Sequence, residues 1–121
     1  MATGMSVGQA NASLDTVLTG TTWIQLHTGS PGAAGTANIA TNSTRKSTTM
    51  SAAASGDKAN NALISWTSVS TTETYTFFTV WTASSAGTFL YSGAITGGSV
   101  TAGNDFSFAS AALVCSITEA S

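Results

Sequence analysis

The chain has 121 residues and a formal net charge of -2, and only 7% of its residues are charged, against roughly a quarter in an ordinary soluble domain. Its three basic residues are too few to bind nucleic acid by releasing counterions from phosphates. No stretch is apolar for long enough to cross a bilayer, and no secretory signal is visible, so we expect no membrane partner. The composition predicts one domain, residues 1–121, whose surface of hydroxyl and methyl groups is suited to packing against other protein.

Residues 1–20 form the N-terminal segment, and part of this segment has the pattern of a short helix. Ser13 is suited to the N-cap position, and Asp15 would then lie in the first turn, where a negative charge stabilises a helix. Apolar residues at helical spacing precede a glycine that can end the element. We therefore expect a helix that begins after Gly8 and ends near Leu18.

Residues 21–28 are the first predicted strand, because they are rich in β-branched and aromatic residues. A cluster of glycine and proline ends this strand. The next segment, residues 29–43, is small and polar, and it predicts a long loop. A loop of this length in a compact domain is usually functional or is ordered by a partner.

Further segments of β-branched and aromatic residues predict the remaining strands. The predicted strands cover residues 45–53, 62–67, 73–81, 88–95, a stretch around residues 106–108, and 111–117, and the predicted turns include residues 55–61 and 84–87. Segment 73–81 has the strongest pattern. Alternation would place Tyr75, Phe77 and Trp81 on one face, and Phe78 with Val80 on the other. Apolar side chains on both faces indicate a central strand, or a strand that a second subunit covers.

The order of these elements predicts the fold class. Short strands at regular spacing with glycine-rich turns are typical of an all-β protein. We expect a single-domain antiparallel β-sandwich or barrel of about seven to eight strands, with a short N-terminal helix.

A search for catalytic chemistry finds little. The five acidic residues are scattered, one histidine and one cysteine lie far apart, and no nucleotide-binding or nucleophile motif is present. We therefore predict no catalytic residue, cofactor or metal. His27 closes the first strand, and we interpret it as a structural residue that fixes the turn made by Gly29, Pro31 and Gly32. The alternative is a catalytic base that acts with Cys115 or a serine.

Aromatic residues are concentrated in the predicted strands. They are Trp23, Trp66, Tyr75, Phe77, Phe78 and Trp81. Stacking on sugars or bases is one possible use of these rings. Their neighbours are Ile, Phe and Val, so packing in the core or in a subunit interface is the favoured interpretation.

Three stretches of the chain carry a resemblance to a known family. They are residues 23–37 (WIQLHTGSPGAAGTA), 72–81 (TETYTFFTVW) and 87–105 (GTFLYSGAITGGSVTAGND). In this order they resemble small virion proteins of tailed bacteriophages, in which a helix precedes a strand that ends in Leu-His-Thr and a Gly-x-Pro-Gly turn. The resemblance runs from about Ser13 to Ile117. It implies a structural protein of the virion, of a kind labelled head decoration, minor tail or tail-fibre-like.

The favoured hypothesis is a capsid decoration protein on the outside of a phage head. It would be a homotrimer that binds the major capsid protein and uses no nucleic acid, membrane or small-molecule substrate. The alternative is a tail-fibre or minor tail protein that contacts the host, and a remote alternative is a small carbohydrate-binding or hydrolase domain. In the first two cases we expect residues 29–43, residues 1–8, or both to contact a neighbouring subunit or the capsid shell.

Overall fold

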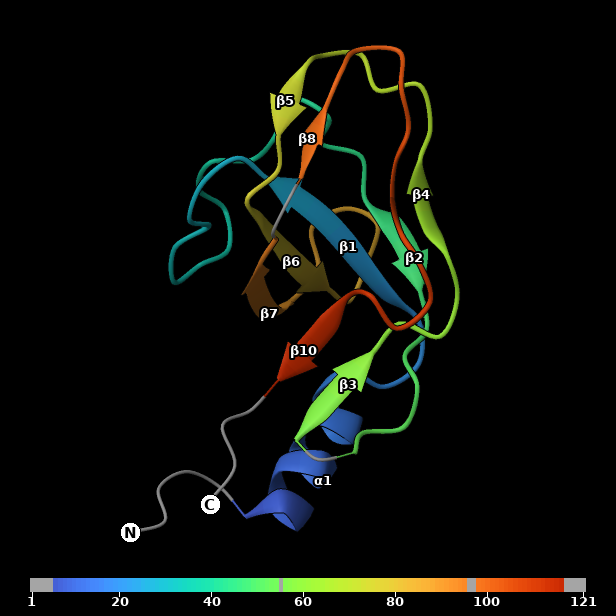
Figure 1. The fold of residues 1–121 in the computed structure, drawn as a ribbon. Helices are drawn as coiled ribbons and strands as arrows, with labels where there is room; N and C mark the ends of the chain where they lie inside the picture. The colour runs from blue at the N-terminus through green and yellow to red at the C-terminus, as the bar shows by residue number, and fades with distance from the viewer. Residues whose placement is uncertain (1–5, 55, 96–97, 117–121) are drawn as a thin grey trace, which may run out of the picture.

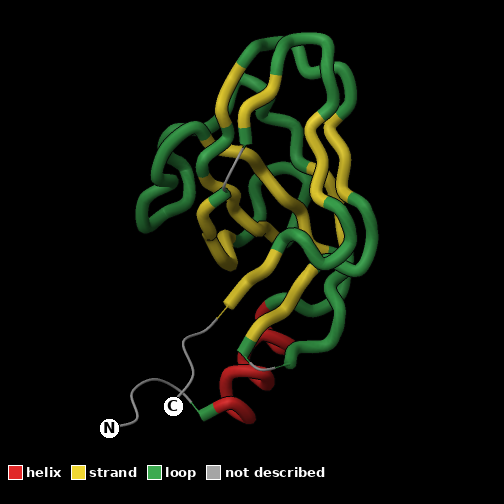
Figure 2. Tube along the Cα trace, viewed as in Figure 1, coloured by secondary structure: helices red, strands yellow, loops and turns green. Residues whose placement is uncertain are grey.

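The computed structural model describes residues 6–54, 56–95 and 98–116, which form one helix and ten short strands (Figures 1 and 2). The helix is α1 (Val7–Val17), and the strands are β1 (Thr22–His27), β2 (Lys46–Thr48), β3 (Asp57–Ala59), β4 (Ile64–Trp66), β5 (Glu73–Thr74), β6 (Phe77–Trp81), β7 (Phe89–Ala94), β8 (Ser99–Val100), β9 (Phe106–Phe108) and β10 (Val114–Ser116). Every strand pair is antiparallel. The expected all-β class with a short N-terminal helix is thus confirmed.

A four-stranded sheet in the order β2-β1-β6-β7 is the centre of the molecule. Strands β1 and β6 are its inner strands, and Ile24 lies opposite Val80 while Leu26 lies opposite Phe78. These four side chains are buried and belong to one hydrophobic cluster. Because side chains alternate along a strand, the same face of the sheet receives all four, and this face is the core face.

Three short two-stranded ladders, β4–β9, β5–β8 and β3–β10, complete the fold. Aromatic rings join one of them, β4–β9, to the core face of the sheet. The Phe108 ring of β9 lies 6.4 Å from Phe78, and the Phe106 ring lies 4.9 Å from Tyr75, both edge-on. Trp66 of β4 packs against the same two phenylalanines of β9. Edge-on contacts of this kind are favourable beyond the area that they bury.

Helix α1 begins earlier than the sequence predicts. Its N-cap is Ser6, whose hydroxyl accepts a hydrogen bond from the Gln9 N–H at 3.4 Å, so the prediction of Ser13 as the cap is wrong. Asp15 therefore lies near the end of the helix, where its negative charge faces a tertiary partner instead of the helix N-terminus. Among the described residues, no helix is long and apolar enough to cross a membrane.

The strand count exceeds the expectation because tertiary pairing creates and divides strands. Residues 55–61, predicted as a turn, contain β3, which pairs with β10. Segment 73–81 is divided into β5 and β6, because Glu73 and Thr74 pair with β8 instead of with the central sheet. The division changes the alternation, so that Tyr75 shares the core with Phe78 and not the opposite face with Phe77.

Candidate functional site

The second face of the central sheet carries four of the residues that the sequence marks as candidates. Trp23 and His27 of β1 lie opposite Trp81 and Phe77 of β6 in the pairing register. All four therefore point away from the core face. His27 and Trp81 are buried there, whereas Trp23 and Phe77 are half-buried. The other candidate aromatics, Trp66, Tyr75 and Phe78, are buried in the hydrophobic core.

A chain of hydrogen bonds runs through the buried His27 ring. Its Nδ1 lies 2.8 Å from the Ala37 carbonyl oxygen, and because a carbonyl only accepts, Nδ1 carries the proton. Its Nε2 lies 2.9 Å from the Thr79 hydroxyl, which must then donate to it. The same hydroxyl oxygen accepts the indole N–H of Trp81 at 2.7 Å. Each of these polar atoms has a partner, so the histidine connects the loop to the sheet.

The environment of His27 favours its neutral form. Burial lowers the pKa of the ring below its ordinary value of about 6.5, and the positive charge of Arg45 acts in the same direction. Hydrogen bonds to the backbone of Ala37 and Asn38 oppose this shift. A neutral ring with both nitrogens occupied by neighbours does not have the geometry of a general base, which needs a free nitrogen within reach of a substrate proton.

The long loop, residues 29–43, is folded against the sheet. The Thr28 N–H donates to the Asn38 carbonyl at 2.9 Å, and the Ala37 N–H donates to the Pro31 carbonyl at 3.0 Å. The carboxylate of Glu73 accepts hydrogen bonds from the backbone N–H groups of Thr41 and Asn42, near the end of the loop, at 2.6 and 3.2 Å. Backbone and side-chain hydrogen bonds therefore hold this loop against the rest of the domain.

Glycine is required at the turns of this loop. Gly32 has a φ of 74° and Gly35 one of 73°, a region that other residues adopt at a cost. A Cβ on Gly35 would lie 2.7 Å from the ring of Phe89. Gly29 is half-buried beside the Asn38 side chain, and Pro31 is buried. The predicted turn residues are therefore in a turn that packs on the second face.

Arg45 covers another part of the second face. Its guanidinium lies 4.2 Å from the centroid of the Trp81 ring, and it donates hydrogen bonds to the carbonyls of Ala83 and Ala86 at 2.8 and 2.7 Å. A planar cation over an indole face is a favourable arrangement. Arg45 therefore ties the turn between β6 and β7 to the start of β2.

An open cleft of about 440 Å³ lies on the other side of the sheet, between β7, β9 and β10. It is lined by Phe78, Ala94, Ile95, Phe106, Ser107, Phe108, Ala112, Leu113 and Val114. Phe78 and Leu113 are buried, whereas Val114 is 41% exposed at the rim. The lining side chains are mostly apolar, but polar atoms contribute more of the exposed surface of the cleft than apolar atoms do.

Cys115, the thiol weighed with His27, is buried on β10, and burial raises its pKa to about 12. A thiol with such a pKa is not a nucleophile at neutral pH. The structure does not join it to His27, whose two ring nitrogens bond elsewhere. In the part of the chain that the structure describes, no three His, Cys, Asp or Glu residues are grouped as metal ligands would be.

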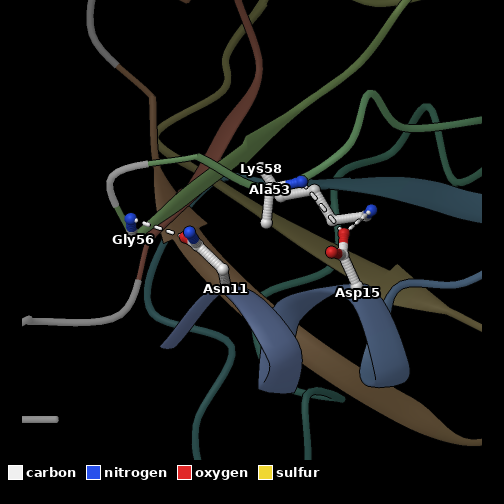
Figure 3. A network of polar contacts seen from close by, with 5 residues as sticks. All are labelled: Asn11, Asp15, Ala53, Gly56 and Lys58. Carbon is white, nitrogen blue, oxygen red and sulfur yellow. Dashed lines mark hydrogen bonds and ion pairs between the residues drawn. The ribbon is translucent and has the colours of Figure 1, made fainter. Parts of the chain in front are cut away.

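Sequence analysis does not identify several residues that join distant parts of the fold. Asp15 of α1 accepts from Lys58 Nζ at 2.6 Å and from the Ala53 N–H at 2.9 Å, and Asn11 accepts from the Gly56 N–H at 2.9 Å (Figure 3). The hydrogen bond from Lys58 lowers the pKa of Asp15. These contacts attach the helix to β3 and to the turn before it. Their partners lie about forty residues apart in the chain, so no local pattern signals them.

The buried Asn60 was also missed. Its amide nitrogen donates to the carbonyls of Ala62 and Ala109, at 2.7 and 2.9 Å, and its side-chain oxygen accepts the Leu113 N–H at 2.9 Å. The side chain is fully buried and connects the segments before β4 and β10. A lone asparagine in a turn-like sequence gives no indication of this role.

Comparison with known proteins gives one family. A family model described as "Podophage GP4 fiber I protein gp80" matches residues 4–116, which is nearly the whole chain. No curated protein sequence matches this chain. The family match supports the expected relationship to bacteriophage virion proteins.

Proposed function

We propose a tail-fibre role for this chain, which belongs to the podophage GP4 fiber I protein family. The observation that carries the proposal is the family match over residues 4–116. Capsid decoration was the favoured hypothesis from the sequence. The family description favours the alternative, a fibre component of the virion tail.

The interactions of the residues on the second face support a structural role. Its only histidine and its buried tryptophan hydrogen-bond to each other through Thr79, and the charged Arg45 is used to hold a turn. The groups most capable of chemistry are thus occupied in packing. A component that binds neighbouring proteins gains from a surface with few charges, because little charge must be desolvated on contact.

We propose that the loop of residues 29–43 supplies one of the contacts with another virion protein or with the host surface. The loop is anchored at His27 and Glu73, while residues 32–34 at its tip are exposed. Exposed loops held on a rigid scaffold are common binding elements. An ordered loop also loses less conformational entropy on binding than a mobile one.

Copy number tests the fibre role. Quantitative mass spectrometry of purified virions, with the major capsid protein as internal standard, should find this chain in a small number of copies per particle. A chain present at a number comparable to the capsid subunits would be a decoration protein, and the proposal would be wrong.

A pair of matched variants tests the loop. Ala34→Asp places a charge at the exposed loop tip, and Ala102→Asp places the same charge on an exposed turn elsewhere. We expect both variants to keep the wild-type thermal unfolding midpoint. Only Ala34→Asp should reduce incorporation into virions or attachment to cells. Equal behaviour of the two variants in both assays would contradict a role for the loop.

A further inference from the structure

Strand β7 is an edge of the central sheet, and no described strand is paired with its outer side, although β10 lies in contact with it. It is hydrogen-bonded to β6 on one side and is last in the order β2-β1-β6-β7. None of its six residues is fully buried, although Phe89, Leu90 and Tyr91 are large and apolar. These three side chains are half-buried, whereas the outer backbone of the strand has no paired strand, and such an edge is a template on which another strand can pair.

The backbone register shows which groups of β7 point outward. The Ile95 N–H donates to the Thr76 carbonyl at 2.8 Å, so residues 95, 93 and 91 bond toward β6. Because antiparallel strands alternate, the N–H and C=O groups of Ser92 and Ala94 point away from the sheet. Both residues are exposed. The pairing irregularity between β6 and β7 lies near the start of β7, at Val80/Trp81, and leaves this outward portion regular.

The opposite edge of the same sheet is protected. Strand β2 has only three residues, includes Lys46, and lies against β4. A short length, a lysine and a covering strand are features by which proteins block edge-to-edge pairing. In contrast, residues 74–104, which include all of β7, contain no charged residue and no proline. The second edge is longer and uncharged, and although β10 contacts β7, no described strand pairs with its outer side.

We propose that β7 of one copy of this chain pairs antiparallel with β7 of a second copy about a two-fold axis. An uncharged edge matches itself without repulsion, whereas a charged partner would lose hydration without gaining a counter-charge. Two-fold pairing lets the same outward groups of Ser92 and Ala94 serve as donors and acceptors on both copies. Ala94 and Ile95 also line the cleft between β7, β9 and β10, which adjoins the surface available to the second copy.

Disulfide cross-linking of the purified full chain tests the pairing. The variants Ser92→Cys and Ala94→Cys place a thiol on β7, and each is oxidised alone and as a mixture of the two. The control is Ser47→Cys, which places a thiol at an exposed position on β2. The native Cys115 is buried and contributes little background. Under mild oxidation we expect a covalent dimer from at least one β7 sample, formed at least tenfold faster than from Ser47→Cys. Equal rates on the two edges would overturn the proposal, as would a trimer without a β7–β7 bond.

Charge substitution gives a second readout that does not depend on oxidation. Ser92→Lys on both copies should raise the dimer dissociation constant at least tenfold in sedimentation equilibrium, whereas Ser47→Lys should leave it unchanged. Matching thermal unfolding midpoints will show that both variants are folded. An unchanged dissociation constant in folded Ser92→Lys contradicts the pairing. Since these measurements use the purified chain, they are independent of its place in the virion.

Discussion

The two faces of the central sheet are stabilised by different interactions. On the core face, Leu26 and Phe78 are opposite each other in a closely packed apolar cluster. On the second face, one residue along, His27 is held by hydrogen bonds to Ala37 and Thr79 and is covered by a loop. Truncating a packed side chain costs free energy that grows with the volume of the cavity left behind. Removing one member of a chain of hydrogen bonds instead leaves its buried partners without a hydrogen bond.

This difference explains how one sheet can both stabilise the fold and hold the exposed loop of residues 29–43 in position. The apolar face supplies a non-directional driving force for folding. The second face fixes the positions of the loop and of the turn that Arg45 binds, because hydrogen bonds have preferred directions. We therefore expect substitutions on the core face to cost the most stability, and those on the second face to cost less and to loosen the loop or the turn as well.

The largest effect is expected from Leu26→Ala on the core face. Leu26 is fully buried, and loss of its side chain should lower the free energy of unfolding by about 3 kcal/mol. The matched control is Leu63→Ala, because Leu63 is 66% exposed and should contribute little. Urea unfolding followed by circular dichroism measures both. Similar losses in the two variants would contradict the assigned core.

A smaller loss is expected from Thr79→Val, which keeps the shape of the side chain and removes its hydroxyl. The change leaves His27 Nε2 and the Trp81 indole N–H without their shared partner, at a cost of about 2 kcal/mol. Thr79→Ser retains the hydroxyl and should restore the Trp81 fluorescence of the wild type. If Thr79→Val is as stable as Thr79→Ser, the hydrogen-bonded chain does not stabilise the second face.

Arg45→Lys tests the cover over Trp81. Lysine keeps the charge but loses the planar group that stacks on the indole and bonds two carbonyls, so we expect a loss of about 1 kcal/mol. Lys46→Arg, at the next position, is the control and should be neutral. Faster amide hydrogen exchange at residues 83–86 should accompany the loss in Arg45→Lys alone.

The smallest effect is a dependence on pH. Burial lowers the pKa of His27 in the folded state, so the unfolded chain binds a proton first as the pH falls below about 6.5. Stability should therefore be complete above that pH and decline toward the lower folded pKa. His27→Gln lacks the titrating group, and its stability should be flat between pH 7 and pH 5. A parallel decline in both proteins would assign the effect to other groups.

The strands of the central sheet were predictable because local pattern and tertiary environment agree there. Residues 21–28 are β-branched and aromatic, and they form β1, which is buried on both faces. The turn after His27 was predictable from its glycines and proline, since their backbone preferences are local. The sequence favours a structural interpretation of His27, but the hydrogen bond between His27 and Thr79 joins positions 52 residues apart and has no local signal.

Other elements depend on distant partners, and the sequence therefore does not reveal them. Strand β3, Asp-Lys-Ala, has low strand propensity and is held by pairing with β10 and by the Lys58–Asp15 ion pair. The division between β5 and β6 depends on pairing with β8, whose two residues lie outside every strand predicted from the sequence. Ile117, the last residue of the final predicted strand, and residues 1–5 of the N-terminal segment lie outside the described residues.

Localisation of the chain on the virion tests the account most directly. Phage carrying an epitope tag at the C-terminus of this chain can be labelled with gold-conjugated antibody and imaged by electron microscopy. The fibre role predicts gold at the tail, on its fibres, with the head shell unlabelled. Gold spread over the head shell would contradict it and would restore the capsid decoration hypothesis.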